Sequence, residues 1–409
     1  MSSSIPLRHL RHLSTATSKT PTSSSSVSIS QAKAKLRTEY DPDKAVEIYS
    51  SVSKNYSSPT SSRYAQDLTV RRLAKSRRFS DIESFIESHK RDPKIVQEPF
   101  LSTLIRSYGV AGMLDHAINT FDQMEQLGTP RSAISFNSLL NACIQSRQYD
   151  KVPHLFDEIP KKYPSVSPDK VSYGILIKSY CESGNPEKGI EVLREMERKG
   201  VEATAITFTT ILNALYKKGN KEEGDKLWSE MMKNGCELDV ASYNVRIMSV
   251  VDAEPEKVKE LIEEMSTMGL KPDTISYNYL MTCYCKNGML DEAKKVYEGL
   301  GANGCTPNAA TFRTLIFHLC LKGLHEQGYK VFKESVRVHK IPEFNTLKHL
   351  ATGLVQNDKI KDAKGLIRTV KKTFPPNFLN AWQKLEEELG LVSGNAAAGE
   401  AQQAKEATG

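Results

Sequence analysis

Side chains that perform covalent or acid–base chemistry are scattered along this chain of 409 residues, and they do not fall into a catalytic pattern. His325 and Glu326 are adjacent, but no HExxH zinc motif is completed around them. Carboxylate pairs such as Glu222 and Glu223 fall on predicted surface helices. The glycine spacing of a phosphate-binding loop does not occur. The sequence therefore predicts a protein that is not an enzyme and has no small-molecule substrate.

The seven cysteines also lack the spacing of a functional site. Only Cys283 and Cys285 are close together, and residues two apart on a helix point to different faces. An odd number of thiols with no paired framework is typical of a reducing compartment. The other five are Cys143, Cys181, Cys236, Cys305 and Cys320. We expect thiols at apolar helix positions, with no metal and no cofactor.

Charge and hydropathy favour a polyanionic partner over a membrane. The formal net charge is +7, which suits a nucleic acid although many soluble proteins reach such a value without binding one. No run of 18 apolar residues occurs, so the sequence predicts no membrane-spanning helix.

Both ends of the chain differ in composition from its middle. Residues 1–38 contain Arg8, Arg11 and Lys19 among many Ser and Thr residues, and no acidic residue precedes Glu39. This composition is typical of an organelle transit peptide, for the mitochondrion or alternatively the chloroplast, and a merely disordered leader is the other interpretation. Residues 391–409 are rich in Ala, Gly and Gln and are predicted to form a disordered tail.

Between these ends, a segment of about 35 residues repeats. Each copy opens with a similar apolar and aromatic pattern, as in TISYNYLMTCY from Thr274 and AITFTTILNAL from Ala205. The copies begin at Glu98, Ala133, Lys170, Ala205, Val240, Thr274, Ala309 and Phe344. This period indicates a solenoid of helix pairs, in which function belongs to the surface that repeated positions present.

The unit from Thr274 shows why each copy is expected to fold as a helical hairpin. Apolar residues recur at helical spacing in its first half, at Tyr277, Leu280, Met281 and Tyr284. Gly288 then ends the first helix. A second apolar stripe consists of Val296, Tyr297 and Leu300. Gly304 and Pro307 form the turn into the next unit, so the stripes are interpreted as packing surfaces rather than a cofactor site.

The unit resembles the pentatricopeptide repeat, in the plain 35-residue class of plant organelles. The resemblance rests on the opening triplets Ser135-Phe136-Asn137, Ser242-Tyr243-Asn244 and Ser276-Tyr277-Asn278, and on the closing Lys271-Pro272-Asp273. Tetratricopeptide repeats have a similar period, but they lack the closing Pro-Asp and carry a small residue where Met281 stands.

The resemblance implies an all-α fold, a right-handed α-solenoid of about eight to nine helix-turn-helix repeats over residues 63–378. We further expect a degenerate helical pair over residues 39–62 and a capping helix over residues 379–390.

In the family that the chain resembles, the fifth and last residues of a unit together select one RNA base. Carried over to this sequence, the pairs are Asn137 with Asp169, Thr209 with Asp239, Asn244 with Asp273, and Asn278 with Asn308. Their implied preferences are uracil, guanine, uracil and cytosine, which gives the string U-any-G-U-C. Pairs that depart from the pattern are Ser102 with Ser132, Gly174 with Thr204, Arg313 with Glu343, and Lys348 with Phe378.

Two further sets of residues are candidates for RNA contacts. The second residues of units are expected to wedge between neighbouring bases, and they are Ile134, Val171, Ile206, Ala241 and Ile275. Lys217 and Lys286, near the ends of first helices, are candidates for phosphate contacts. The alternative role for these lysines is to stabilise the negative end of the helix dipole.

The readable string is too short to select one transcript, because four bases recur about once in 256 nucleotides. Either further contacts add specificity, or another structure such as a ribosome holds the protein in place. Short members of the resembled family are built into plant mitochondrial ribosomes, chiefly the small subunit. We therefore predict a single-stranded RNA-binding adaptor in mitochondrial RNA metabolism or translation, with mRNA or rRNA as ligand and small-subunit proteins as candidate partners. The alternative is a protein-interaction scaffold without base-specific RNA recognition.

Overall fold

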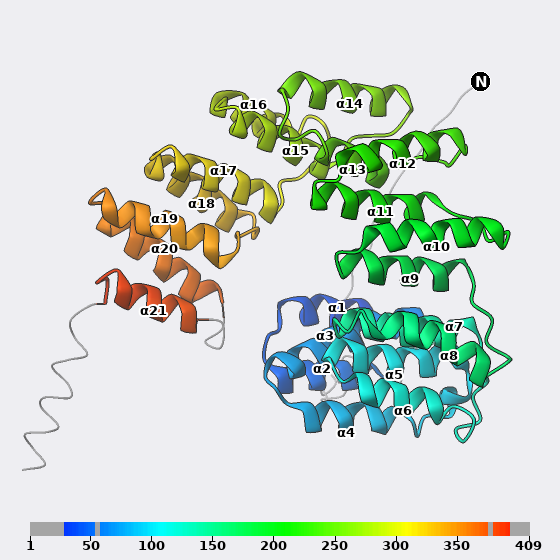
Figure 1. Ribbon diagram of the computed structural model, residues 1–409. Coiled ribbons are helices and arrows are strands. Elements are labelled where there is room, and N and C mark those ends of the chain that lie inside the picture. Colours follow the sequence, from blue (N-terminus) through cyan, green and yellow to red (C-terminus); the bar gives the residue numbers. More distant parts are fainter. Residues whose placement is uncertain (1–27, 54–57, 375–378, 393–409) are drawn as a thin grey trace, which may run out of the picture. The chain divides into compact units, whose positions relative to one another are not determined.

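The computed structural model describes residues 28–53, 58–374 and 379–392, which form helices and the turns between them, without a strand (Figure 1). The chain divides into two compact units, the first ending at Arg78 and the second beginning at Phe79. In the ranges described, no helix is both long and apolar enough to cross a bilayer. The predicted all-α fold class is confirmed. The first 27 residues of the predicted leader and most of the predicted tail lie outside the described residues.

The described part of the first unit consists of α1 (Ile29–Thr38), α2 (Pro42–Ser53) and α3 (Pro59–Lys75). Helix α1 lies within the span that the sequence analysis assigned to the leader. It is a regular helix because Ser28 and Gln31 form a capping box at its start and because Ala32 and Leu36 are fully buried. The span 39–62, predicted to form a degenerate helical pair, contains α2 and only the start of α3, and both helices contact α1.

Two arginines, Arg72 of α3 and Arg78 just after this helix, help to hold the first unit together. The Nε of Arg72 donates to the carbonyl oxygen of Glu39 at 2.8 Å, and its guanidinium lies over the Tyr40 ring. Arg78 forms an ion pair with Asp43 at 2.6 Å.

The second unit begins with α4 (Phe79–His89) and a 3₁₀ turn (Pro93–Val96), and continues as a series of hairpins. The first helices of the hairpins are α5 (Glu98–Ala111), α7 (Ala133–Gln145), α9 (Lys170–Glu182), α11 (Ala205–Lys218), α13 (Val240–Met248), α15 (Thr274–Lys286), α17 (Ala309–Leu321) and α19 (Phe344–Gln356). The second helices are α6 (Leu114–Asp122), α8 (Lys151–Lys162), α10 (Pro186–Arg198), α12 (Lys221–Lys233), α14 (Pro255–Thr267), α16 (Leu290–Gly299), α18 (His325–Arg337) and α20 (Ile360–Thr373). Each first helix begins at the residue predicted from the repeat.

At three junctions, aromatic rings join a second helix to the first helix that follows it. Phe156 of α8 contacts Tyr173 of α9 with ring centroids 5.0 Å apart. Trp228 contacts Tyr243 at 5.7 Å in the same way, and the α16–α17 pair repeats the contact. Because such edge-on contacts combine large apolar burial with a preferred geometry, they fix how one hairpin docks on the next.

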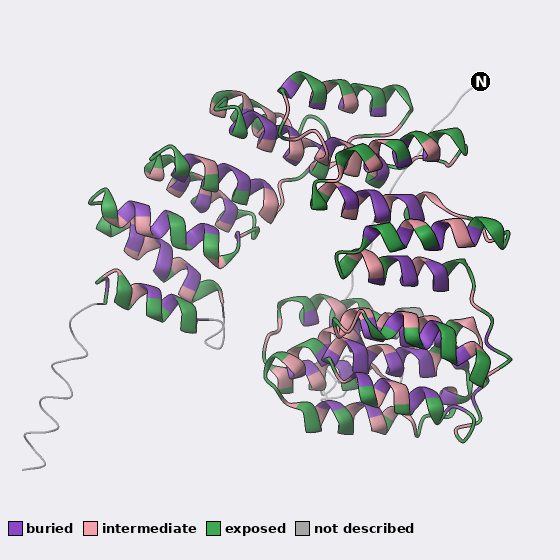
Figure 2. Ribbon diagram, viewed as in Figure 1, coloured by how far each residue is buried: buried purple, intermediate pink, exposed green. Residues whose placement is uncertain are grey.

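Successive first helices also contact one another, from α5 with α7 through to α17 with α19. Buried residues gather where neighbouring helices meet, and exposed residues cover the outer sides of the helices (Figure 2). The first helices therefore share one continuous solvent-facing side, here called the first-helix face, and each contact between two consecutive first helices is here called a seam.

A last helix, α21 (Asn380–Glu388), closes the series inside the span predicted for a cap. Its Trp382 and Leu385 are buried in a cluster with residues of α19 and α20, and the Trp382 ring contacts Phe344 at 4.9 Å. This helix covers the apolar side that the last hairpin would otherwise expose to water.

Candidate functional site

The last residue of each unit is the N-cap of the next first helix. Asp169, Asp239 and Asp273 adopt extended backbone conformations, and their carboxylates accept hydrogen bonds from backbone N–H groups in the first turns of α9, α13 and α15. Short polar side chains are the preferred residues for this task, because they satisfy an otherwise unpaired N–H. Helix capping alone therefore accounts for the residue type at this position.

The fifth residue of the preceding unit joins this cap across the seam. Asn137 donates from Nδ2 to Asp169 Oδ1 at 3.0 Å. Its Oδ1 accepts from the Ser172 hydroxyl at 2.6 Å, and that hydroxyl accepts from the Asp169 backbone N–H at 3.1 Å. The Ser172 N–H also donates to Asp169 Oδ1 at 2.9 Å. We call this closed set of hydrogen bonds the seam network.

The seam network occurs again at two later seams. Asn244 donates to Asp273 Oδ1 at 3.1 Å and accepts from the Ser276 hydroxyl at 2.7 Å. Asn278 makes the corresponding bonds to Asn308 Oδ1 and from Thr311, at 3.2 Å and 2.8 Å. The structure thus brings together three of the four pairs of site residues named from the sequence.

The geometry leaves particular atoms of each network without a protein partner. The inward Oδ1 of Asp169 and Asp273 is occupied, and the described residues supply no hydrogen bond to the other carboxylate oxygen. At Asn308 the Oδ1 accepts from the Thr311 N–H, so the amide NH₂ points the other way. Each asparagine at the fifth position also keeps one N–H. Two seams therefore offer a donor beside an acceptor, and the third offers two donors.

Exposure differs among the paired residues. Asp169 is exposed, whereas Asn244 and Asn278 are only 6% and 9% exposed. The two asparagines are largely covered because the next first helix packs over them with Ser276 and Thr311. Burial acts to raise the pKa of Asp169, but hydrogen bonds from Asn137 and from Ser172 outweigh it, and the pKa lies below the ordinary range.

The pair of Thr209 and Asp239 is not in direct contact. The Thr209 hydroxyl lies 3.1 Å from the Ser242 hydroxyl, which in turn donates to Asp239 Oδ1 at 2.7 Å. Threonine is shorter than asparagine, so the Thr209 hydroxyl reaches Ser242 and not Asp239.

At the α5–α7 seam, Glu98 shares the capping task with Ser132, whose hydroxyl accepts from the Ile134 N–H at 3.1 Å. The buried Glu98 carboxylate accepts from the backbone and hydroxyl of Ser132, each at 2.7 Å, and from the N–H of Ser135 at 3.0 Å. Ser102 at the fifth position is buried and does not contact Ser132 in the described hydrogen bonds. Gly174, at the fifth position of α9, has open space where a Cβ would lie.

Branched apolar side chains beside the seam residues are exposed to solvent. They are between 46% and 74% exposed, and they are Ile134, Val171, Ile206 and Ile275. Each lies three residues before a fifth position, which places both on the same side of the helix. Single exposed apolar residues are common on protein surfaces, but these four recur at the same position of four repeat units.

Comparisons with known proteins agree with this repeated architecture. A family model described as PPR repeat family matches residues 131–182, 168–217, 204–249 and 272–321, and one described as PPR repeat matches residues 101–129. The chain is 68% identical over 395 residues to the small ribosomal subunit protein mL103 (rPPR7) of Arabidopsis thaliana, covering 96% of each chain. It is 60% identical to a mitochondrial pentatricopeptide repeat-containing protein of the same plant, covering 97% of this chain and 95% of that one. The chain belongs to the pentatricopeptide repeat family.

The family assignment made from the repeat triplets is thus confirmed, and the second relative is named as a mitochondrial protein, in agreement with the predicted mitochondrial localisation. Among solved structures, the chain is similar to the pentatricopeptide repeat protein PPR10 in complex with an 18-nt psaJ RNA element. The TM-score is 0.46 at 16% identity, and the match covers 84% of this chain and 60% of that one.

The two candidate lysines of the pentatricopeptide repeats differ in their surroundings. Lys286 is engaged by Asp252, so a phosphate would compete with an ion pair there. Lys217 is exposed, and the structure gives it no acidic partner among the described residues, whereas its neighbour Lys218 pairs with Glu187 at 2.9 Å. Exposed pairs of this kind are worth at most about 1 kcal/mol, so such competition is weak.

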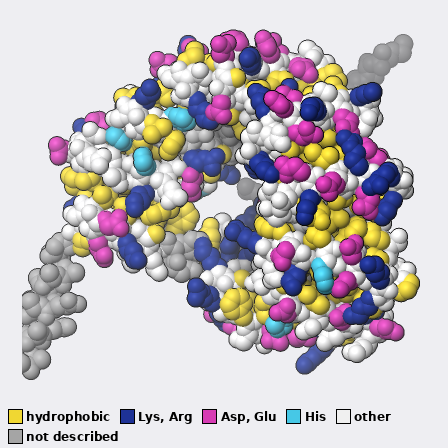
Figure 3. Space-filling model, viewed as in Figure 1, with side chains coloured by type: hydrophobic (Ala, Val, Ile, Leu, Met, Phe, Trp, Pro, Cys, Tyr) yellow, Lys and Arg dark blue, Asp and Glu magenta, His cyan; other side chains and the backbone are white. Residues whose placement is uncertain are grey.

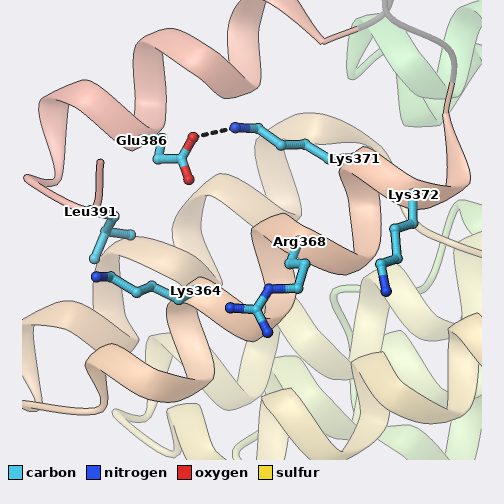
Figure 4. Close-up of a pocket in the computed structure, with 6 residues that line it drawn as sticks. All are labelled: Lys364, Arg368, Lys371, Lys372, Glu386 and Leu391. Carbon is cyan, nitrogen blue, oxygen red and sulfur yellow. Dashed lines mark hydrogen bonds and ion pairs between the residues drawn. The ribbon is translucent and has the colours of Figure 1, made fainter. Parts of the chain in front are cut away.

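Sequence reasoning missed a basic surface on α20, the second helix of the last pentatricopeptide hairpin. Lys364, Arg368 and Lys372 extend from successive turns, while Lys371 pairs with Glu386 of α21 (Figure 4). These residues border a cavity of about 250 Å³. The signal in the sequence was the spacing of four residues, which puts the three cations on one side of a helix. Elsewhere, over the face seen in Figure 3, basic and acidic side chains are interspersed.

The cysteines occupy packing positions rather than a reactive site. Five of the seven are buried, and burial raises the pKa of Cys143, Cys181, Cys285 and Cys320 to about 12. Such thiols are protonated at neutral pH and are poor nucleophiles. Within the described ranges, no group of His, Cys, Asp and Glu side chains has the arrangement of a metal site.

Proposed function

We propose that this protein binds single-stranded RNA along its first-helix face, as a component of the small subunit of the mitochondrial ribosome. The observation that carries the RNA part is the seam network, which repeats at three seams and leaves polar atoms of defined character unpaired. The ribosomal part is supported by 68% identity, over nearly the full length of both chains, to a small ribosomal subunit protein. The chain acts in this role by binding alone.

The unpaired atoms explain a choice between pyrimidines. Beside Asp169 and Asp273, one N–H of an asparagine and one carboxylate oxygen are available to a base. Uracil matches this pattern, because it places a carbonyl oxygen beside the N3–H group. Beside Asn308, two N–H donors are available, which match the carbonyl oxygen and the unprotonated N3 of cytosine. The fixed direction of the cap residue therefore turns an Asp-to-Asn difference into a uracil-to-cytosine difference.

Guanine offers a carbonyl oxygen beside an N–H as uracil does, so size must separate the two bases. The side chain of Thr209 is shorter than asparagine and so leaves more room for the larger ring, with Asp239 as the acceptor. The exposed Ile134, Ile206 and Ile275 then cover the faces of the bases, which supplies contact area without dependence on sequence. The proposed string is U-any-G-U-C from the N-terminal to the C-terminal hairpins.

Four readable bases do not select a site by themselves, and two features compensate. Assembly into a ribosome restricts the RNA that the protein meets. The α20 cations Lys364, Arg368 and Lys372 can bind phosphates of any sequence, which adds affinity that depends on salt. Lys217 and Lys286 would contribute in the same way along the first-helix face.

Two measurements test the proposal. Tagged protein expressed in plant mitochondria should sediment with the small ribosomal subunit and crosslink to rRNA. Sedimentation at the top of the gradient, or with mRNA only, would remove the ribosomal assignment. Separately, purified protein should bind the oligonucleotide UAGUC more tightly than a scrambled one, with affinity that falls steeply as salt rises. Equal, salt-independent binding would favour a protein-interaction scaffold.

A further inference from the structure

We propose that the hairpin from Ala309 holds one unpaired nucleobase by stacking in a pocket between α15, α17 and α19, in place of the amide reading used at earlier seams. This inference rests on the proposed RNA-binding function and extends it by one nucleotide. The pocket has a volume of about 430 Å³. Its principal residues are Arg313, Phe317, His318, Glu343 and His349.

The pocket lies in register with the base-reading pairs. Arg313 and Glu343 occupy the fifth and last positions of this unit, where earlier units carry Asn with Asp or Asn. Thr282 and Thr314, from α15 and α17, line its other side. The pocket therefore continues the first-helix face directly beyond the seam of Asn278 and Asn308. An RNA strand whose cytosine is bound at that seam would place its next nucleotide in the pocket.

Aromatic rings give the pocket its character. Phe317 is 40% exposed, although large aromatic side chains are usually buried. Its ring centroid lies 5.4 Å from that of His318 and 6.2 Å from that of His349. Burial lowers the pKa of His318, and Lys286 lowers it further, so this imidazole is neutral at pH 7 and offers a flat, uncharged surface. Exposed flat rings on an RNA-facing surface bind bases by stacking, whatever their sequence.

Charged groups at the rim complete a nucleotide site. Arg313 is exposed, and the described residues give it no ion-pair partner, so its guanidinium can bind the phosphate. Glu343 is held by the Thr346 hydroxyl, which donates to its Oε1 at 2.7 Å. A carboxylate can only accept hydrogen bonds, so it favours a base edge that carries N–H donors. An arginine and a carboxylate around stacked rings fit a nucleotide better than an apolar peptide.

The test combines protein variants with altered RNA. The probes are the hexamer UAGUCG and the same hexamer with an abasic residue in the last position. Removal of the base should weaken wild-type binding about 5- to 150-fold. Phe317→Ala should weaken binding of the intact hexamer by a similar factor and should no longer distinguish the two probes. Phe317→Leu keeps apolar bulk without a flat ring and should lose most of the discrimination.

Leu321→Ala is the matched control, because Leu321 is an exposed apolar residue one turn further along α17 that does not line the pocket. It should behave as wild type. If wild-type protein binds both probes equally, or if Phe317→Ala still distinguishes them, the stacking pocket is refuted while RNA binding stands. If wild-type protein binds neither probe better than a scrambled hexamer, the proposed function itself fails.

Discussion

The middle seams and the C-terminal seam of the array use the same fold with different chemistry. At α13–α15 and α15–α17, an asparagine bridges to the N-cap of the next helix, while at α17–α19 Arg313 and Glu343 flank an open pocket. The helices start and stack alike in both regions. Hairpin stacking therefore does not require asparagine at the fifth position, although asparagine also bridges the seams where it occurs.

The largest expected effect concerns the middle seams. Asn244→Ala with Asn278→Ala should lower affinity for UAGUC on the order of 100-fold, because each base loses a matched pair of hydrogen bonds. Binding of a scrambled oligonucleotide should change little. Fluorescence anisotropy at constant salt provides the measurement.

The same double variant removes acceptors from the Ser276 and Thr311 hydroxyls, so thermal unfolding must be followed in parallel. Each loss should cost about 1–3 kcal/mol of stability. Asn234→Ala with Asn303→Ala, two exposed asparagines after second helices, is the matched control. A folded double variant that binds UAGUC as wild type does would contradict base reading at these seams.

The next largest effect concerns the phosphate contacts of α20, which do not depend on RNA sequence. Replacing Lys364, Arg368 and Lys372 by Ala should weaken binding of every RNA that reaches α20, on the order of 30-fold at low salt. A plot of log affinity against log salt should become shallower by about two, since each lost phosphate contact contributes about 0.7. Longer RNA of unrelated sequence is the appropriate probe.

Helix α12 supplies the control for that experiment. Lys221, Lys226 and Lys233 are exposed there, but acidic residues including Glu223 are interspersed with them, and Lys226 pairs with Glu223 at 3.4 Å. Their replacement by Ala should leave the salt dependence nearly unchanged. Equal effects of the two triple variants would mean that only total charge matters, and that α20 is not a distinct surface.

Repetition explains how much of this molecule the sequence could predict. One repeated pattern predicts helix starts from Glu98 to Phe344, because a similar apolar spacing recurs in every unit and a short polar residue precedes most of the first helices. Helix α1 escaped prediction because its basic, acid-free sequence is also that of a leader, and only burial of Ala32 and Leu36 distinguishes the two. The Phe317 pocket escaped because its residues come from three units, which periodicity within one unit does not connect.

A third prediction concerns a seam network introduced by substitution at the α9–α11 seam, which lacks one. Gly174→Asn with Thr204→Asp should create a network with Thr207, because open space surrounds Gly174 and Thr207 occupies the place that Thr311 has beside Asn278. Wild-type protein should not discriminate at the second base, whereas the variant should prefer UUGUC to UAGUC by about tenfold. Gly174→Ala stabilises the helix without adding a polar group that could bind a base, so it should show no preference between UUGUC and UAGUC.

The smallest effect distinguishes two roles of Asp169, which caps helix α9 and is proposed to bind the first base through its outward oxygen. Asp169→Asn keeps the cap, as Asn308 does in the same position, but replaces the outward acceptor with a donor. Preference at the first base should change from uracil to cytosine by several-fold, measured with UAGUC and CAGUC. If the variant still prefers uracil, the outward oxygen of Asp169 does not select the base.

The same substitution has a consequence for pH that does not involve RNA. The folded-state pKa of Asp169 is lowered, so its ionised form adds stability above the unfolded pKa of about 3.9, and that stability is lost as pH falls through the folded value. The amide that replaces this carboxylate in the variant does not titrate. The difference in unfolding free energy between wild type and Asp169→Asn should therefore be constant above about pH 5 and should shift in favour of the variant as the pH falls below about 4. If the unfolding free energies of the two proteins fall in parallel below about pH 4, the carboxylate gains nothing from Asn137 and Ser172. The seam network would then not hold Asp169 in its ionised form.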